Sequence, residues 1–186
     1  MLDYIIQKDK ELLIFLNSLG NEQWDGIWLT ITNQFSWTPL FILILFLVFK
    51  FLGLKKGIFT VVFIALLITF SDQITNVIRG VFERLRPNND PEIKEVLRTL
   101  IKPQSYSFTS GHATTSTVVA IFIIMLLKEY TNYIKLLAFF PLIFAYSRLY
   151  LGVHFPLDIL FGFINGTIIG CLSYHLYKYL NLKIFN

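Results

Sequence analysis

Five apolar runs separated by short polar segments dominate the pattern of this 186-residue chain. Read as helices, these runs are residues 37–54, 57–85, 112–127, 133–150 and 155–180. Each approaches or exceeds the length that crosses the hydrocarbon of a bilayer. Pro87 ends the second run, Pro141 predicts a kink in the fourth, and Pro156 suits the first turn of the fifth. The pattern therefore predicts one domain, residues 1–186, that folds as an all-α, polytopic transmembrane helical bundle.

The first 34 residues are less regular than these runs. Leucines and isoleucines predict one apolar helical face, made of Leu2, Ile5, Ile6, Leu12, Leu13 and Leu16. Asp9 interrupts this face, and Gly20 ends the predicted helix. We expect an interfacial amphipathic helix here, although packing on the bundle fits the pattern equally well. An interface is also indicated by three tryptophans, Trp24, Trp28 and Trp37. Residues 26–34 fit a helix that enters the bilayer obliquely, so the number of spans is five or six.

The composition supports a membrane protein. Hydrophobic residues make up 55% of the chain and charged residues only 15%, against about a quarter in a typical soluble domain. The formal net charge is +4, but the basic residues stand at the ends of apolar runs. Their placement indicates contact with the lipid bilayer and its anionic headgroups, and it argues against nucleic acid as a partner.

Polar side chains also recur within the apolar runs. Asp72, Asn76 and Arg79 follow one another at steps of three or four, so they share one helical face. Because charged groups are costly to expose to lipid, this face is expected to point into the protein. Glycines at steps of four in the fifth run predict the close approach of another helix; they are Gly162, Gly166 and Gly170.

Three polar segments, 79–87, 110–112 and 147–158, lie where runs begin or end on the same side of the membrane. Outside them, the opposite side holds seven lysines: Lys50, Lys55, Lys56, Lys128, Lys135, Lys178 and Lys183. The side of the three segments holds five basic residues: Lys8, Lys10, Lys94, Arg98 and Lys102. Lysine and arginine favour the cytoplasmic side. We therefore expect the lysine-rich side to be cytoplasmic and the polar segments to face the periplasm or cell exterior.

These segments contain the residues of an anion site. Arg79, Arg86 and Arg148 match phosphate oxygens with paired donors. Ser110 and Gly111 stand at the start of a helix, where backbone N–H groups favour an anion. The alternative for each arginine alone is an interfacial side chain that extends toward the headgroups. The three arginines together, beside two histidines, favour a phosphate site.

The histidines indicate chemistry at that phosphate. A neutral His154 can attack phosphorus, Asp158 four residues later can hold its other ring nitrogen, and His112 can protonate the leaving oxygen. Zinc held by these three residues is the competing interpretation. The neighbouring arginines argue against a divalent cation, so the sequence predicts no metal and no cofactor.

In its three polar segments the chain resembles the type 2 phosphatidic-acid phosphatases, which are integral-membrane lipid phosphate phosphatases. Their third motif, Ser-Arg-x5-His-x3-Asp, is complete in Ser147, Arg148, His154 and Asp158. The second, Pro-Ser-Gly-His, has threonine in place of proline in Thr109-Ser110-Gly111-His112. The first, Lys-x6-Arg-Pro, has arginine in place of lysine in Arg79-x6-Arg86-Pro87.

The resemblance implies a metal-independent phosphatase acting on a membrane lipid through a phosphohistidine. It makes His154 the nucleophile, Asp158 its partner and His112 the general acid. It assigns phosphate binding to Arg79, Arg86, Ser110, Gly111 and Arg148. The candidate substrates are undecaprenyl diphosphate, lipid A, phosphatidylglycerol phosphate and phosphatidic acid, with the first two favoured.

Four further points stay open in the sequence. Arg84 either reaches a phosphate or pairs with Glu83 or the headgroup region. Residues 88–109 form a loop long enough to act as a lid. Two rival functions remain: a lipid phosphotransferase that uses the same intermediate, and a non-catalytic protein that binds or transports anionic lipids. The oligomeric state is left unassigned.

Overall fold

The computed structural model describes residues 1–185 of the chain. Its α-helices are α1 (Leu2–Ser18), α2 (Glu22–Thr32), α3 (Thr38–Phe82), α4 (Gly111–Leu127), α5 (Phe139–Tyr150) and α6 (Pro156–Phe185). Short 3-10 helices are Gln34–Trp37, Pro87–Asn89 and Asn132–Ala138. The described residues contain no β-strand, which confirms the all-α prediction.

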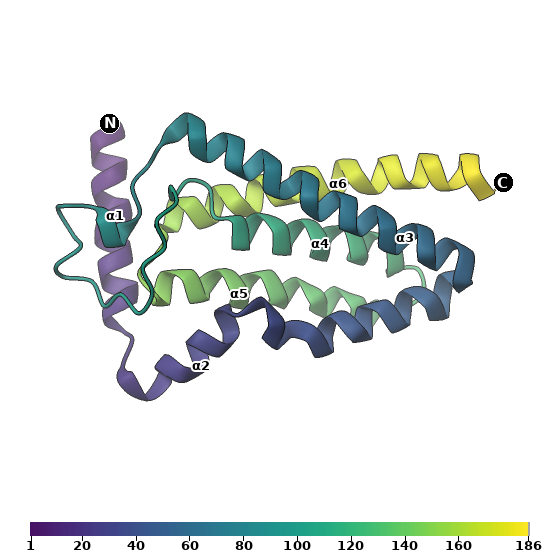
Figure 1. The fold of residues 1–186 in the computed structure, drawn as a ribbon, viewed down its shortest axis with the longest axis horizontal. Helices are drawn as coiled ribbons and strands as arrows, with labels where there is room; N and C mark the ends of the chain where they lie inside the picture. The colour runs from purple at the N-terminus through teal and green to yellow at the C-terminus, as the bar shows by residue number, and fades with distance from the viewer. Residues whose placement is uncertain (186) are drawn as a thin grey trace.

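The helices form a bundle with one helix laid across its end (Figure 1). The two arms of α3 run lengthwise with α4, α5 and α6, while α1 crosses the end where α6 begins. The chain reverses inside α3 at Gly53, where φ is +74° and helical geometry is interrupted. The sequence prediction placed this break at Lys55 and Lys56, which is wrong by two residues. The break falls on a glycine because only glycine adopts a positive φ without strain.

Two other helix boundaries also differ from the prediction. The second run was expected to stay helical to Leu85, but α3 ends at Phe82 and Glu83 adopts the left-handed conformation. The predicted kink at Pro141 is wrong, because α5 starts at Phe139 and the proline occupies its first turn. The missing N–H of proline costs nothing there, since first-turn amides have no partner within the helix.

The glycines of α6 are covered by α4, as the spacing predicted. A Cβ at Gly166 would lie 2.6 Å from the carbonyl oxygen of Thr114, and one at Gly170 would lie 3.0 Å from the Cβ of Ile121. Ordinary contact begins at 3.4 Å. Helices α4 and α6 therefore meet backbone to backbone, which fixes the residues that begin each helix relative to one another.

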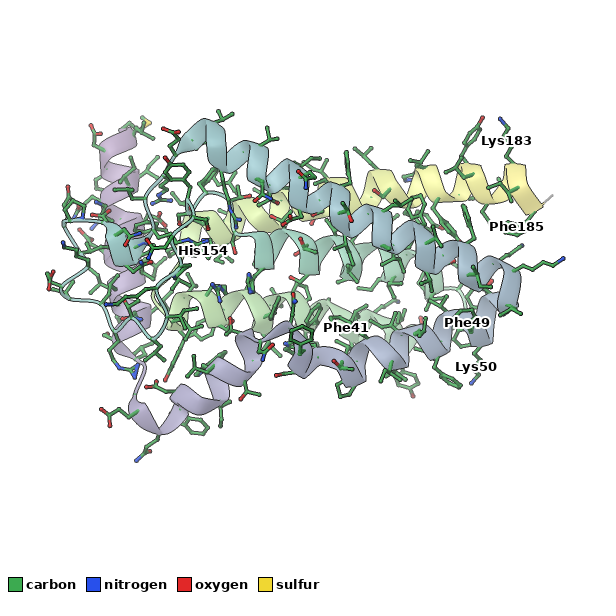
Figure 2. All side chains as sticks on the ribbon, viewed as in Figure 1. Phe41, Phe49, Lys50, His154, Lys183 and Phe185 are labelled. Atoms are coloured by element: carbon green, nitrogen blue, oxygen red, sulfur yellow. The ribbon has the colours of Figure 1, made fainter. Side chains whose placement is uncertain are left out.

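The outer surface of the bundle is apolar. Two helical segments are long and apolar enough to cross a membrane, namely Gln34–Asn89 and Pro156–Phe185. In the most apolar 18-residue stretch of each, the buried share is only 11% and 22%, respectively. A soluble protein would cover such segments rather than expose them. Figure 2 shows the two ends of the bundle: His154 lies near α1, whereas Lys50 and Lys183 lie at the opposite end.

Helix α1 packs on the bundle through its polar face. Asp9, Lys10 and Asn17 are buried together with Leu13. The Asn17 side chain donates to the carbonyl oxygen of Tyr150 at 2.8 Å and accepts from the amide of Arg98 at 2.8 Å. The outer side is apolar and exposed, with Leu2, Ile5, Ile6, Leu12 and Phe15. Helix α1 therefore packs on the bundle, which is one of the two arrangements that the sequence allowed, and Asn17 ties it to the 88–109 loop.

Candidate active site

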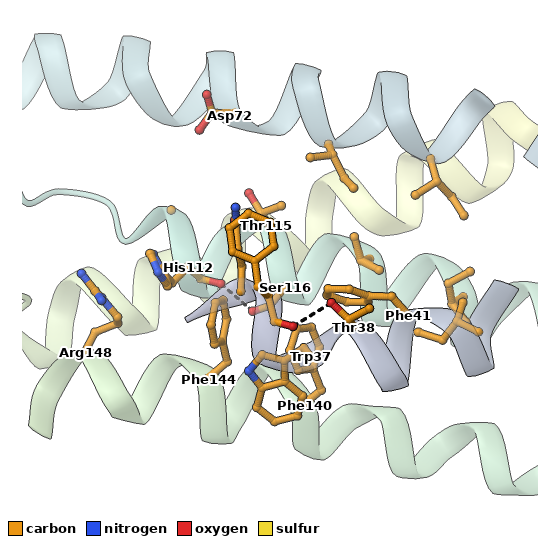
Figure 3. Close-up of a pocket in the computed structure, with 18 of the residues that line it drawn as sticks. Trp37, Thr38, Phe41, Asp72, His112, Thr115, Ser116, Phe140, Phe144 and Arg148 are labelled. Carbon is orange, nitrogen blue, oxygen red and sulfur yellow. Dashed lines mark hydrogen bonds between the residues drawn. The ribbon is translucent and has the colours of Figure 1, made fainter. Parts of the chain in front are cut away.

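A cavity of about 810 Å³ opens between α3, α4, α5 and the 3-10 helix Gln34–Trp37 (Figure 3). Most of its wall is apolar and includes Phe41, Ile44, Val48, Ile64, Phe140 and Phe144. Five residues of the three polar segments also line it, namely Arg79, Arg86, Gly111, His112 and Arg148. The cavity thus joins a cationic site to an apolar channel, which suits an amphiphile with an anionic head.

Arg79 and Arg148 approach the cavity from different helices. Arg79 donates its Nε–H to the carbonyl oxygen of Thr109 at 3.2 Å. Its guanidinium lies so close to Gly111 that a Cβ there would sit 3.1 Å from Nη2. Arg148 donates from Nη1 to Oγ1 of Thr32 at 2.6 Å, while its buried Nε has no partner among residues 1–185. Both side chains are anchored and keep donors for an anion.

Arg86 is 4% exposed and lies directly against His154. Ser105 accepts from its Nε through the carbonyl oxygen at 2.7 Å and from its Nη2 through Oγ at 2.9 Å. Its Nη1 donates to the carbonyl oxygen of Val153 and lies 3.0 Å from Nε2 of His154. Because arginine only donates, Nε2 accepts this bond and the ring proton resides on Nδ1.

His154 is 1% exposed, in the turn between α5 and α6. Burial lowers the pKa of His154 to about 3; Asp158 opposes the shift, and the positive charges of Arg86 and Arg148 add to it. The ring is therefore neutral at neutral pH, with a lone pair on Nε2. The Nη1 donor of Arg86 is directed at this lone pair.

The carboxylate of Asp158 is fully buried beside the other ring nitrogen. Its Oδ2 accepts from the Ser107 hydroxyl and from the backbone amide of Phe155, the latter at 2.8 Å. Nδ1 of His154 lies 3.4 Å from this oxygen and 3.4 Å from Oγ of Ser107. Asp158 and Ser107 together therefore face the ring proton and fix the plane of the imidazole.

The start of α4 forms another side of the site. Ser110 is its N-cap: the side chain accepts from the amide of Ala113, and its own amide donates to the carbonyl oxygen of Asp158 at 3.1 Å. The amides of Gly111 and His112 come next, in the first turn, where N–H groups have no helical partner. Ser110 thus stands behind the cavity wall, while Gly111 and His112 line it.

Arg84 points away from this cavity. Its Nη1 donates to Oδ1 of Asp158 at 2.9 Å, and its Nη2 donates to Oδ2 of Asp9 at 2.6 Å. Arg84 thus contacts two carboxylates that the sequence did not predict as its partners, in place of a pair with Glu83. Both oxygens of Asp158 are hydrogen-bonded, which leaves this carboxylate poorly placed to hold the zinc ion considered above. Residues 1–185 contain no group of three or more histidine, cysteine, aspartate or glutamate side chains arranged for a metal.

Sequence reasoning missed two polar residues of this site. Ser107 precedes the Ser110–His112 segment by three residues and is completely buried against Asp158. Asp9 was treated only as an interruption of an apolar face, yet it is buried and accepts from the amide of Leu157 at 2.8 Å. A lone charge inside an otherwise apolar helical face was the signal that marked Asp9.

A family model described as the PAP2 superfamily matches residues 58–182. The chain belongs to the PAP2 superfamily. A lipid A 4'-phosphatase of Bacteroides thetaiotaomicron is 32% identical, over 99% of this chain and 83% of its own length. A protein of the same name from Porphyromonas gingivalis is 28% identical, over 96% of this chain and 76% of its own length.

Two solved structures share the fold of this PAP2 protein. The transmembrane phosphatidylglycerolphosphate phosphatase of Bacillus subtilis superposes with a TM-score of 0.71 at 22% identity, covering 98% of this chain and 90% of its own. LpxE of Aquifex aeolicus gives a TM-score of 0.68 at 26% identity, covering 89% and 93%. The chain is thus a membrane lipid phosphate phosphatase of a metal-independent hydrolase family, which confirms the resemblance and the enzyme class predicted from sequence.

Proposed function

We propose that this PAP2 phosphatase removes a phosphate from a phosphorylated glycolipid of the lipid A type through a phosphohistidine at His154. The observation that carries the proposal is the convergence of three arginines and His112 on one cavity, with His154 held neutral beside Arg86. Arginines alone would explain only the binding of a phosphate. A buried, oriented imidazole adds the nucleophile that turnover requires.

The proposed reaction has two steps. In the first, the lone pair on Nε2 of His154 attacks phosphorus, the bond from phosphorus to the lipid oxygen breaks, and His112 gives that oxygen a proton. In the second, water attacks the phosphohistidine, His112 takes the proton from water, and the bond from phosphorus to Nε2 breaks to release inorganic phosphate. Asp158 stabilises the imidazole as its charge develops, as a carboxylate does in other histidine-centred sites.

The phosphate is bound by Arg79, Arg86 and Arg148 together with the amides of Gly111 and His112. Ser110 contributes as the cap that directs those amides into the cavity. A phosphate dianion that enters the site balances the positive charge of the arginines around His112. Substrate binding therefore prepares the general acid as well as the electrophile.

The relatives and the cavity both support a glycolipid. Lipid A 4'-phosphatases match almost the whole chain at 28–32% identity. Asp72 and Thr115 line the cavity along with Arg79, and Figure 3 shows both among the lining residues. A carboxylate and a hydroxyl beside the arginines suit the hydroxyl groups of a sugar, whereas the apolar walls beyond suit acyl chains.

The proposed membrane placement follows from the exposed apolar surface. The two arms of α3, with α4, α5 and α6, form five spans, while α1 and α2 lie at the interface. The apolar outer side of α1 then faces lipid, and the lysine-rich end faces the cytoplasm. The active site opens toward the periplasm, where a lipid displayed on the outer leaflet can enter it.

The test is phosphate release by purified protein in detergent with EDTA. The panel contains a bisphosphorylated acylated glucosamine disaccharide, undecaprenyl diphosphate, phosphatidylglycerol phosphate and phosphatidic acid. We expect fastest release from the disaccharide, undiminished by EDTA and absent in His154→Ala. Faster phosphate release from undecaprenyl diphosphate than from the disaccharide would make undecaprenyl diphosphate the preferred substrate. Loss of phosphate release in EDTA would overturn the proposed metal-free histidine chemistry. Phosphate transferred to an added alcohol instead of released would indicate the phosphotransferase.

A further inference from the structure

A network of ion pairs and hydrogen bonds outside the cavity lining connects α1 to Asp158, the partner of His154. Arg84 bridges two carboxylates, Asp158 at 2.9 Å and Asp9 at 2.6 Å. The other oxygen of Asp9 accepts from the amide of Leu157, in the first turn of α6. The guanidinium carbon of Arg84 also lies 3.8 Å from the ring centre of Phe155.

We propose that Arg84, held in place by Asp9 of α1, is a positioning residue that orients the Asp158 carboxylate toward His154. This inference rests on the proposed role of His154 and Asp158. It assigns a catalytic contribution to α1, a helix that donates no residue to the cavity. It also assigns Arg84 a task other than binding the phosphate.

The geometry separates this role from phosphate binding. Both terminal nitrogens of Arg84 are engaged by carboxylates, and its planar face lies against Phe155. The arginines that line the cavity are Arg79, Arg86 and Arg148. Arg84 consequently acts on the reaction only through Asp158.

The charges explain why an arginine is needed. The side chains of Asp9 and Asp158 are 2% and 0% exposed, so each is removed from the solvent that would stabilise its charge. A buried carboxylate without a partner tends to take up a proton, and a protonated Asp158 could no longer stabilise a positive His154. A forked guanidinium serves two carboxylates at once, which the single ammonium of lysine does less well.

The orientation of the carboxylate depends on the same contacts. Arg84 holds Oδ1 of Asp158, while Ser107 and the amide of Phe155 hold Oδ2. Without Arg84, Oδ1 loses its partner and the carboxylate turns about the contacts of Oδ2, which changes the angle at which Oδ2 faces the ring proton of His154. Displacement of a catalytic group on the scale of an ångström typically costs about 100-fold in rate.

The test compares Arg84→Gln, Arg84→Lys and Asp9→Asn with the control Asp25→Asn. Asp25 pairs with Arg98 at 2.6 Å and likewise ties an N-terminal helix to the loop, but it does not contact Asp158. Rates are measured with EDTA on whichever lipid of the panel the wild type hydrolyses fastest. Inhibition by inorganic phosphate reports the anion site separately.

We expect Arg84→Gln to lower kcat by about 10- to 100-fold while KM and the phosphate inhibition constant stay within about twofold. Arg84→Lys should recover part of that loss. Asp9→Asn should lower kcat in the wild type but have little further effect in Arg84→Gln, because both changes break one network. Asp25→Asn should keep kcat within about twofold of the wild type.

Three results would overturn the inference. One is an unchanged kcat in Arg84→Gln. Another is a raised KM and phosphate inhibition constant with kcat unchanged, which would make Arg84 a phosphate ligand. The third is an equal loss of kcat in Asp9→Asn and Asp25→Asn, which would indicate general fixing of the loop. If Arg84→Gln does not fold, Arg84→Lys and Asp9→Asn decide between the same outcomes.

A second readout needs no turnover and so stands apart from the proposed function. With ¹⁵N-labelled histidine, the Nδ1 resonance of His154 reports its hydrogen bond to Asp158 and Ser107. Arg84→Gln and Asp9→Asn should shift this resonance, and Asp25→Asn should leave it in place. If the wild type releases phosphate from no lipid, the proposed function fails, whereas an unmoved resonance in Arg84→Gln contradicts the network.

Discussion

Substitution of Gly162 by alanine should damage catalysis more than stability. Gly162 on α6 faces the first turn of α4, where a Cβ would lie 2.8 Å from the Cβ of Ala113 and 3.0 Å from the carbonyl oxygen of Ser110. The closer approach falls 0.6 Å short of ordinary contact at 3.4 Å. Because both neighbours are buried and one is backbone, the start of α4 must move, and it carries His112 and the Gly111 amide.

The magnitude follows from that displacement. Crowding of a packed interface typically costs about 1–3 kcal/mol, while replacing glycine by alanine within a helix returns about 1 kcal/mol. The expected loss of unfolding free energy is therefore about 0–2 kcal/mol. A shift of several tenths of an ångström in His112 and the phosphate donors should lower kcat/KM by about 10- to 100-fold.

Gly170 provides the matched control. It lies two turns farther along the same face of α6, and its Cβ would approach Ile121 and Val118 at 3.0–3.1 Å, away from the cavity. Gly170→Ala should leave kcat/KM within about twofold of the wild type. Phosphate release and thermal unfolding in detergent measure both variants. Full activity in Gly162→Ala, or equal losses in the two variants, would refute the reasoning.

Three further predictions concern the charged site. Arg148→Lys removes the Nε donor and the fork, so phosphate inhibition should weaken by about 10-fold; unchanged inhibition would exclude Arg148 from the anion site. Ser107→Ala removes the hydroxyl between Asp158 and His154, so kcat should fall by about 10-fold with KM little changed, and an unaltered kcat would show that the serine has no role. Because burial lowers the pKa of His154 to about 3, the ring should stay neutral as the pH falls from 8 through 6.5 to 5. Histidine ¹⁵N resonances checked across this range would contradict the account if His154 titrated near 6.5.

The fold was predictable where the pattern reports a single physical requirement. Apolar runs located the helices of the bundle, and the glycine spacing located the α4–α6 contact. The turn at Gly53 was misplaced because two nearby lysines resemble the end of a span. Lysine is compatible with a helix, whereas the positive φ of Gly53 interrupts one. Pro141 was misread because a proline inside an apolar run looks the same in a kink and in a first turn.

The site was predictable only as far as local motifs carry it. Arg79, Arg86, His112 and Arg148 line one cavity because their segments all lie at one end of the bundle. The contacts of Arg84 with Asp9 join residues 75 positions apart, so no local spacing announces them. The hydrogen bond from Ser107 to Asp158 likewise joins residues 51 positions apart. Such partners become visible only when the 88–109 loop and α1 are placed in space.

The central claim is that His154 becomes covalently phosphorylated. Its most direct test is a rapid quench of wild-type enzyme with a ³²P-labelled lipid phosphate in EDTA, followed by acid and base treatment of the denatured protein. The account predicts one label per turnover-competent site that is stable in base, lost in acid and absent from His154→Ala. Wild-type release of phosphate with no labelled protein, or a label that persists in His154→Ala, would contradict it.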